Sequence, residues 1–269
     1  MVIQHNIAAN NAYRNLSSNA TNGQKNLEKL SSGYRINRSA DDAAGLAISE
    51  QMRSKINGLD QATSNANDAI GLIQTAEGAL TETHSMLQRM VTLATQSANG
   101  TYNSTARGAI AEEVDALQKE INRIASTTDY NGVKPLSQTN TITVQIGPTA
   151  GEKLEVATAA MSTNALGIDA ISVSSTTKAN AAITKINTAI NTVSTHRAKL
   201  GASQNRLEHT INNLKTTNEN MTAAESRIRD TDMAKEMAAF TKNNILNQAA
   251  QSMLSQANQQ PQGVLSLLR

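Results

Sequence analysis

Apolar side chains near the start of the chain recur at alternating intervals of four and three residues. The stripe consists of Ala9, Tyr13, Leu16, Ala20, Gly23, Leu27, Leu30 and Tyr34. This spacing places them along one seam of a helix that packs against a partner. Gly33 suits the end of that helix, and the acceptor side chains Asp41 and Asp42 suit the start of another. We therefore predict two separate helices here.

A second and longer stripe runs from Met52 to Ala94. It predicts a continuous helix of roughly 65 Å at about 1.5 Å per residue, which Asn99-Gly100 ends. A shorter helix follows, with its seam at Ile110, Val114, Leu117, Ile121 and Ile124. The turn at residues 129–132 closes it.

The period then changes to two in Ile142, Val144 and Ile146 and again in Leu154 and Val156, with turn residues between the two runs. Alternation of this kind predicts a β-hairpin near residues 140–157. Residues 157–179 are rich in Ala, Ser and Thr and have little period, so we expect a loop with short extended pieces.

Helical spacing returns at Ile183 and continues to Ile228, although polar residues at positions 197, 204, 218 and 225 interrupt the seam. A last helix starts near Met233, and we expect Pro261 to stop it because proline cannot donate a backbone hydrogen bond. The apolar tail at residues 264–268 is expected to be exposed unless something covers it.

These elements predict a mainly α fold, a long helical hairpin or coiled-coil rod with a small β-hairpin insertion. The start and the end of the chain are expected to run side by side. A pair of long helices buries little surface and is only marginally stable alone. Other copies of the chain are therefore expected to supply the missing burial.

Composition excludes several classes of function. Aromatic residues make up 2% of the 269, cysteine is absent, and the net charge is +2. This balance does not favour nucleic acid, and the missing cysteines exclude disulfides and thiolate metal sites. No apolar run could cross a bilayer, and the first ten residues lack a Sec-type signal pattern. We expect no membrane insertion and no cleavable signal peptide.

No pattern of catalytic residues is found. The four histidines lie far apart in sequence and match no metal-ligand spacing. Asp41 with Asp42, and Asp230 with Asp232, could act as acid–base pairs, but both pairs stand where helix caps are needed. No phosphate loop or nucleophile elbow occurs. We expect a protein that is not an enzyme and needs no cofactor or metal.

Three stretches are specific enough to indicate a family. They are LSSGYRINRSADDAAGLAISE at residues 30–50, IQTAEGALTETHSMLQRM at residues 73–90, and NRLEHTINNLKTTNENMTAAESRIRDTDMAKEM at residues 205–237, followed by NQQPQGVLSLLR at the end of the chain. They closely resemble the terminal regions of bacterial flagellins, over about the first 135 and the last 90 residues.

The resemblance implies a secreted subunit that polymerises into the extracellular flagellar filament. Residues 1–44 and 226–269 would form the inner coiled-coil domain D0, and residues 45–225 would form domain D1, without outer domains. Export through the flagellum's own type III apparatus would fit the missing signal peptide. The implied partners are other copies of the chain, an export chaperone, the export apparatus, and the filament cap and hook-junction proteins.

Two sets of residues follow for the candidate sites. The self-assembly seam comprises Leu16, Leu27, Leu30, Met237, Phe240, Leu246 and Met253. In the family, a segment matching residues 87–93, with Glu113, contacts the innate receptor Toll-like receptor 5. This chain keeps Arg89, Leu93 and Glu113 but has Val91 and Thr92 where a second arginine and a glutamate would stand. The loss of two charged contacts argues against recognition.

Two other functions remain open at this stage. A hook–filament junction protein shares the terminal architecture, but the match through the last residues favours the filament subunit. An intracellular helical-hairpin signalling module would also be long and helical, but the β-hairpin and the apolar C-terminal tail speak against it.

Overall fold

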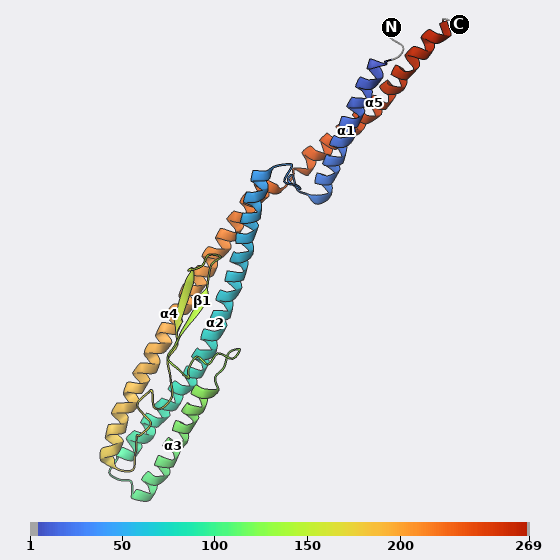
Figure 1. Ribbon diagram of the computed structural model, residues 1–269. Coiled ribbons are helices and arrows are strands. Elements are labelled where there is room, and N and C mark those ends of the chain that lie inside the picture. Colours follow the sequence, from blue (N-terminus) through green and yellow to red (C-terminus); the bar gives the residue numbers. More distant parts are fainter. Residues whose placement is uncertain (1–4, 268–269) are drawn as a thin grey trace. The chain divides into compact units, whose positions relative to one another are not determined.

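The computed structural model describes residues 5–267, and side chains as far as residue 260. The described chain is mainly α-helical with one small sheet, as the sequence predicts (Figure 1). Its elements in order are α1 (Ile7–Ser32), α2 (Ala43–Ala98), α3 (Ser104–Thr127), β1 (Thr141–Gln145), β2 (Lys153–Ala157), α4 (Thr176–Arg229) and α5 (Met233–Leu267).

Contacts between residues divide the chain into two units. One consists of Met1–Ile56 and Glu219–Arg269, and the other of Asn57–Asn218. The helices α2 and α4 are continuous and contribute to both units.

In the first unit, α1 and α5 pack along each other (Figure 1). Gly33 ends α1 with a left-handed φ of 74°, which costs a glycine little because it has no Cβ. The expected cap at the start of α2 is confirmed, since Asp42 Oδ1 accepts a 2.9 Å hydrogen bond from the Gly45 N–H. Asp232 caps α5 in the same way, accepting from the N–H groups of Ala234 and Lys235.

The second unit holds the hydrophobic core. Buried side chains of α2, α3, α4 and both strands form one continuous cluster that includes Ile73, Leu87, Ile121 and Ile186. The two strands pair antiparallel, with Thr141 opposite Ala157 and Gln145 opposite Lys153, so the predicted hairpin is confirmed. Residues 158–175 form turns and no strand.

Helix α4 differs from the expected pattern in two ways. It begins at Thr176, seven residues before the apolar stripe that begins at Ile183. Its buried face also runs through Ala179, Ala182, Ala189 and His196, while Ile183 and Ile190 are only partly buried. Small alanine side chains let neighbouring helices approach closely, and a stripe defined by large apolar residues overlooks them.

The prediction that Pro261 stops the last helix is wrong, because α5 continues through it to Leu267. Proline removes one backbone hydrogen bond from a helix and leaves the carbonyl four residues earlier without its usual donor. Here the side-chain amide of Asn6 donates to that carbonyl, the oxygen of Ala257, at 2.8 Å. The expected exposure of the tail concerns side chains outside those that the structure describes.

Candidate assembly surface

The large apolar side chains that remain exposed are concentrated in the first unit. Among the described side chains, all of them except Val133 belong to it: Ile7, Tyr13, Leu27, Ile48, Met233, Met237, Ile245, Leu246 and Met253. Exposed apolar patches of this kind mark surfaces that bind other proteins. By contrast, Gly23 is the only buried residue of α1.

The side of α1 that contacts α5 carries small and polar residues. Half-buried or buried positions recur there at helical spacing: Asn6, Ala9, Ala12, Leu16, Asn19, Gly23, Asn26 and Leu30. Gly23 stands opposite Asn247, whose side-chain nitrogen would lie 3.9 Å from a Cβ at that position. The two helices therefore meet along a seam with few large apolar side chains.

The side of α5 that faces α1 also carries mainly small and polar residues. Its half-buried positions are Glu236, Ala239, Phe240, Asn243, Asn247, Ala250, Leu254 and Ala257. Met237 and Met253 are 50% and 62% exposed, so they lie outside this stripe. Apolar side chains thus occupy two sides of α5, and only one side contacts α1.

The residues predicted for the assembly seam fall on both sides of the pair. Leu16, Leu30 and Phe240 are half-buried. Leu27, Met237, Leu246 and Met253 are exposed, at 55%, 50%, 39% and 62%. We call the exposed set, together with Tyr13, the outer apolar face. The predicted set omits Ile7, Ile48 and Ile245, which are also exposed, and it omits Met233, although Met233 precedes Met237 by one helical turn.

A clasp of backbone and side-chain contacts joins the two chain segments that flank α1 and α5. The N–H of Arg35 donates to the Arg229 carbonyl at 2.7 Å, and that of Thr231 donates to the Gly33 carbonyl at 3.0 Å. The Arg229 guanidinium stands 4.7 Å from the centre of the Tyr34 ring and donates to Glu50 Oε1 at 2.6 Å. Sequence spacing gave no sign of this clasp.

A turn between α1 and α2 is fixed by Asp41. Its carboxylate accepts hydrogen bonds from the backbone N–H groups of Arg38, at 3.0 Å, and Asn37, at 3.2 Å. These two bonds lower the pKa of Asp41 because they favour the charged form. Asp41 therefore acts as a structural acceptor.

The segment expected to meet the innate receptor lies in the second unit. Arg89 and Glu113 form an ion pair across α2 and α3, with nitrogen and oxygen 2.8 Å apart. Leu93 is 2% exposed and belongs to the core. The two charged residues are thus brought together, and Leu93 is not accessible on the surface of the isolated chain. Receptor contact itself stays a prediction.

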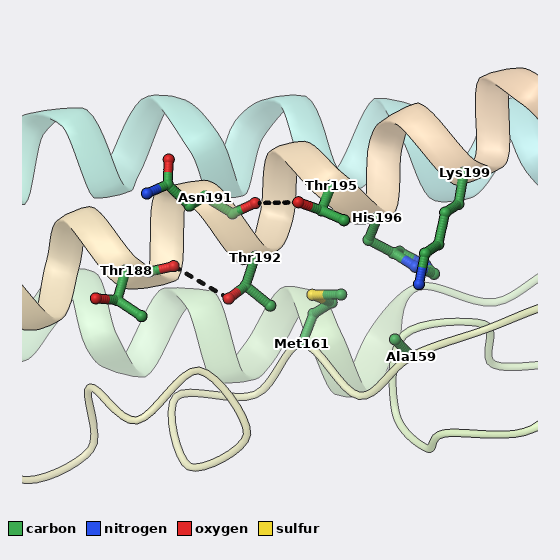
Figure 2. Close-up of a pocket in the computed structure, with 8 residues that line it drawn as sticks. All are labelled: Ala159, Met161, Thr188, Asn191, Thr192, Thr195, His196 and Lys199. Carbon is green, nitrogen blue, oxygen red and sulfur yellow. Dashed lines mark hydrogen bonds between the residues drawn. The ribbon is translucent and has the colours of Figure 1, made fainter.

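A groove in the second unit that holds His196 shows no catalytic arrangement. It has a volume of about 350 Å³ and lies between α4 and the segment that carries Ala159 and Met161 (Figure 2). The hydroxyls of Thr192 and Thr195 donate to carbonyls of their own helix. Burial, and secondarily the charge of Lys199, lower the pKa of His196. No carboxylate, cysteine or second histidine is among the residues that line this groove.

The described residues contain no cluster of three or more His, Cys, Asp or Glu side chains that could hold a metal ion. In the same part of the chain, no helix is both long and apolar enough to cross a bilayer. The distinguishing features are therefore the long helices and the uncovered apolar side chains of the first unit. Together they define a structural subunit that associates with other copies.

Comparison with known proteins identifies the family. Residues 3–141 match the bacterial flagellin N-terminal helical region, and residues 183–268 match the bacterial flagellin C-terminal helical region. Flagellin of Halalkalibacterium halodurans is 54% identical over 272 residues, and flagellin of Bacillus subtilis is 52% identical over 305, each covering all of both chains. The flagellar filament 33 kDa core protein of Treponema phagedenis is 46% identical over 286 residues, also over both full lengths.

The chain belongs to the bacterial flagellin family and is a structural subunit of the flagellar filament. A crystal structure of Bacillus cereus flagellin agrees, with 34% identity and a TM-score of 0.51 over 60% of this chain and 94% of that one. A putative flagellar hook-associated protein from Vibrio parahaemolyticus has a TM-score of 0.60 but only 12% identity, so it shares the fold alone. Neither alternative function gains support.

Proposed function

We propose that the chain polymerises by burying its outer apolar face, formed by Tyr13, Leu27, Met237, Leu246 and Met253, against neighbouring copies. The supporting observation is the concentration of exposed large apolar side chains on α1 and α5. Fully burying one leucine or methionine contributes about 1.5–3 kcal/mol. Several such residues would offset much of the entropy lost when a subunit joins the filament.

The test is polymerisation of a variant that loses this surface without disturbing the α1–α5 contact. Leu27→Ser with Met237→Ser should raise the critical concentration at least about tenfold, which corresponds to ~1.4 kcal/mol per added subunit. Gln24→Ser with Gln248→Ser, on the same two helices and also exposed, is the matched control. Seeded assembly of the double serine variant at the wild-type critical concentration would refute the proposed surface.

We also propose that the two units correspond to the domains expected from the family, with residues 1–44 and 226–269 as D0 and residues 45–225 as D1. Support comes from the division of contacts at residues 56–57 and 218–219. The first turns of α2 lie in the first unit because Glu50 belongs to the clasp. The last turns of α4, residues 219–225, also lie in the first unit by their contacts, so its bounds extend beyond those expected for D0.

Before assembly, the uncovered apolar side of α5 needs protection, so we propose that an export chaperone binds residues 240–268. Exposed amphipathic helices self-associate unless a partner fills the apolar side. The proposal extends to export through the flagellar type III apparatus, to contacts with cap and hook-junction proteins, and to the absence of catalysis. A pull-down in which deletion of residues 230–269 leaves chaperone binding unchanged would refute the chaperone site.

A further inference from the structure

Half-buried asparagines recur on the contact between α1 and α5, and three of them are grouped toward the end of α1. We call Asn26, Asn243 and Asn247 the asparagine ladder. In the amide orientation that gives both the oxygen and the nitrogen of Asn26 a partner, the oxygen accepts a hydrogen bond from Asn243 Nδ2 at 3.0 Å. The nitrogen donates to Glu236 Oε1, also at 3.0 Å. The next rung along α5, Asn247, lies against Gly23.

The ladder carries a cost in stability. The Asn247 Oδ1 atom is buried and has no hydrogen-bond partner in the structure. Leaving a buried acceptor unsatisfied is unfavourable, and a leucine layer in the same place would bury apolar surface instead. The sequence nevertheless places asparagine here while leaving Met237 and Leu246 exposed outside the contact with α1.

We propose that the asparagine ladder fixes the register of α1 against α5 and keeps the isolated pair weakly stable. A polar layer in a helix pair is satisfied only when it meets its polar partner, so a shifted register would bury unpaired amides. Apolar layers discriminate poorly, because leucine and alanine pack acceptably in several registers. The ladder thus positions α1 against α5 within one subunit, whereas the outer apolar face serves contacts between subunits.

The first test measures register directly in filaments. The natural chain has no cysteine, so Ser18→Cys with Lys242→Cys gives two unique exposed sites for nitroxide labels. A small fraction of labelled chain is assembled with excess unlabelled chain, and the label-to-label distance is measured by pulsed electron paramagnetic resonance. A slip by one heptad moves the labels by about 10 Å along the axis.

We expect one narrow distance for the native ladder and a broadened or two-peaked distribution for Asn26→Leu with Asn243→Leu. Asn243→Ala removes the amide without adding bulk. It replaces the leucine variant in this measurement if that variant does not assemble into filaments. The matched control is Asn11→Leu with Asn244→Leu, which changes exposed asparagines on the same helices. A single narrow distance in the ladder variants, equal to that of the native chain, would overturn the register role.

The second test measures how much the ladder destabilises the α1–α5 pair. The measurement is hydrogen exchange of α1 amides in the dilute monomer. Replacing the ladder by leucine should slow exchange about tenfold, equivalent to ~1.4 kcal/mol, while the control exchanges as the native chain does. Equal or faster exchange in the ladder variant would show that the asparagines do not weaken the pair. Because this readout needs no polymer, it is independent of whether the outer apolar face drives assembly.

Discussion

The side-chain amide of Asn6 donates a 2.8 Å hydrogen bond to the carbonyl oxygen of Ala257, which lies 251 residues away in sequence. The same side chain caps α1, because its Oδ1 accepts from the Ala9 N–H at 3.0 Å. Ala257 precedes Pro261 by one helical turn, so its carbonyl lacks the usual backbone donor. Asn6 therefore satisfies one backbone group of α1 and one of α5 at the same end of the pair.

A double-mutant cycle between these two features should reveal coupling. Asn6→Ala should destabilise the start of α1 by about 0.5–2 kcal/mol through loss of the cap. In a Pro261→Ala background the Ala257 carbonyl regains a backbone donor, so the same change should cost less, by about 0.5–1.5 kcal/mol. Hydrogen exchange of residues 250–260 in filaments measures both effects, with exposed Asn10→Ala as the control. Strictly additive effects would exclude the coupling.

The clasp around Arg229 should be sensitive to the shape of its cation. Arg229→Lys keeps the charge but loses the planar group over Tyr34, a contact that contributes about 0.5–1 kcal/mol. We expect the amides of Arg35 and Thr231, which donate across the clasp, to exchange about two- to fivefold faster. Arg53→Lys is a suitable control, since Arg53 also pairs with Glu50 but only at 3.7 Å. Unchanged exchange would mean that the ring contact contributes nothing.

Acid should destabilise the second unit through His196. This side chain is 6% exposed, and burial, followed by the charge of Lys199, lowers its pKa below the usual 6.5. The unfolded chain then binds a proton more readily than the folded one, so stability is complete above about pH 6.5 and falls as the pH decreases through the lowered pKa. Urea unfolding followed by circular dichroism between pH 7.5 and 5 measures this slope.

Two substitutions separate the causes of that slope. His196→Gln should flatten it, because the titrating group is gone. Lys199→Gln should make it shallower without removing it, since desolvation remains the larger cause. A His196→Gln chain that loses stability with acid as steeply as the native chain would assign the effect to other groups.

Helix position and type could be predicted from the sequence where the apolar stripe was strong. The seams of α2 and α3 and the alternation of Val144, Leu154 and Val156 led to the correct elements, because large buried side chains mark the core directly. The α1–α5 contact was predicted only in part. Ala9, Leu16, Gly23 and Leu30 of the predicted stripe lie on its contact side, but a search for apolar residues passes over the half-buried asparagines between them.

The candidate site was predicted only in part for the same reason. Leu27 and Leu30 belong to one apparent stripe in sequence, yet one is exposed and the other half-buried. The end of α5 was misjudged because the rule for proline considers only the helix itself. Asn6 supplies the compensating donor from the opposite end of the sequence, and no local pattern contains that information.

The isolated monomer should have a resistant core and susceptible ends. Only Gly23 is buried in α1, whereas the second unit has a continuous apolar core, so the ends should open far more often than the core. Brief proteolysis of dilute monomer should leave one fragment within residues 45–225. The same protease applied to filaments should leave the ends intact. Equal protection of the ends and the core in dilute monomer would contradict this prediction.

Alanine substitutions at Leu27 and Leu30 should act through different contacts. Leu27 is 55% exposed, so Leu27→Ala should leave the α1–α5 pair intact and weaken contacts between subunits. Leu30 is half-buried, so Leu30→Ala should weaken the pair itself. Truncating a fully buried leucine costs about 2–5 kcal/mol, and even ~1.4 kcal/mol per added subunit raises the critical concentration about tenfold.

Both variants should therefore suppress polymerisation, but hydrogen exchange of α1 in the dilute monomer should accelerate only in Leu30→Ala. The sedimentable fraction after seeding measures assembly, and circular dichroism checks that the core of Asn57–Asn218 melts as in the native chain. Faster monomer exchange in Leu27→Ala would show that this leucine supports the pair. If the core of either variant melts many degrees lower than that of the native chain, the substituted leucine stabilises the folded monomer. The seam would then belong to the core and not to the assembly surface.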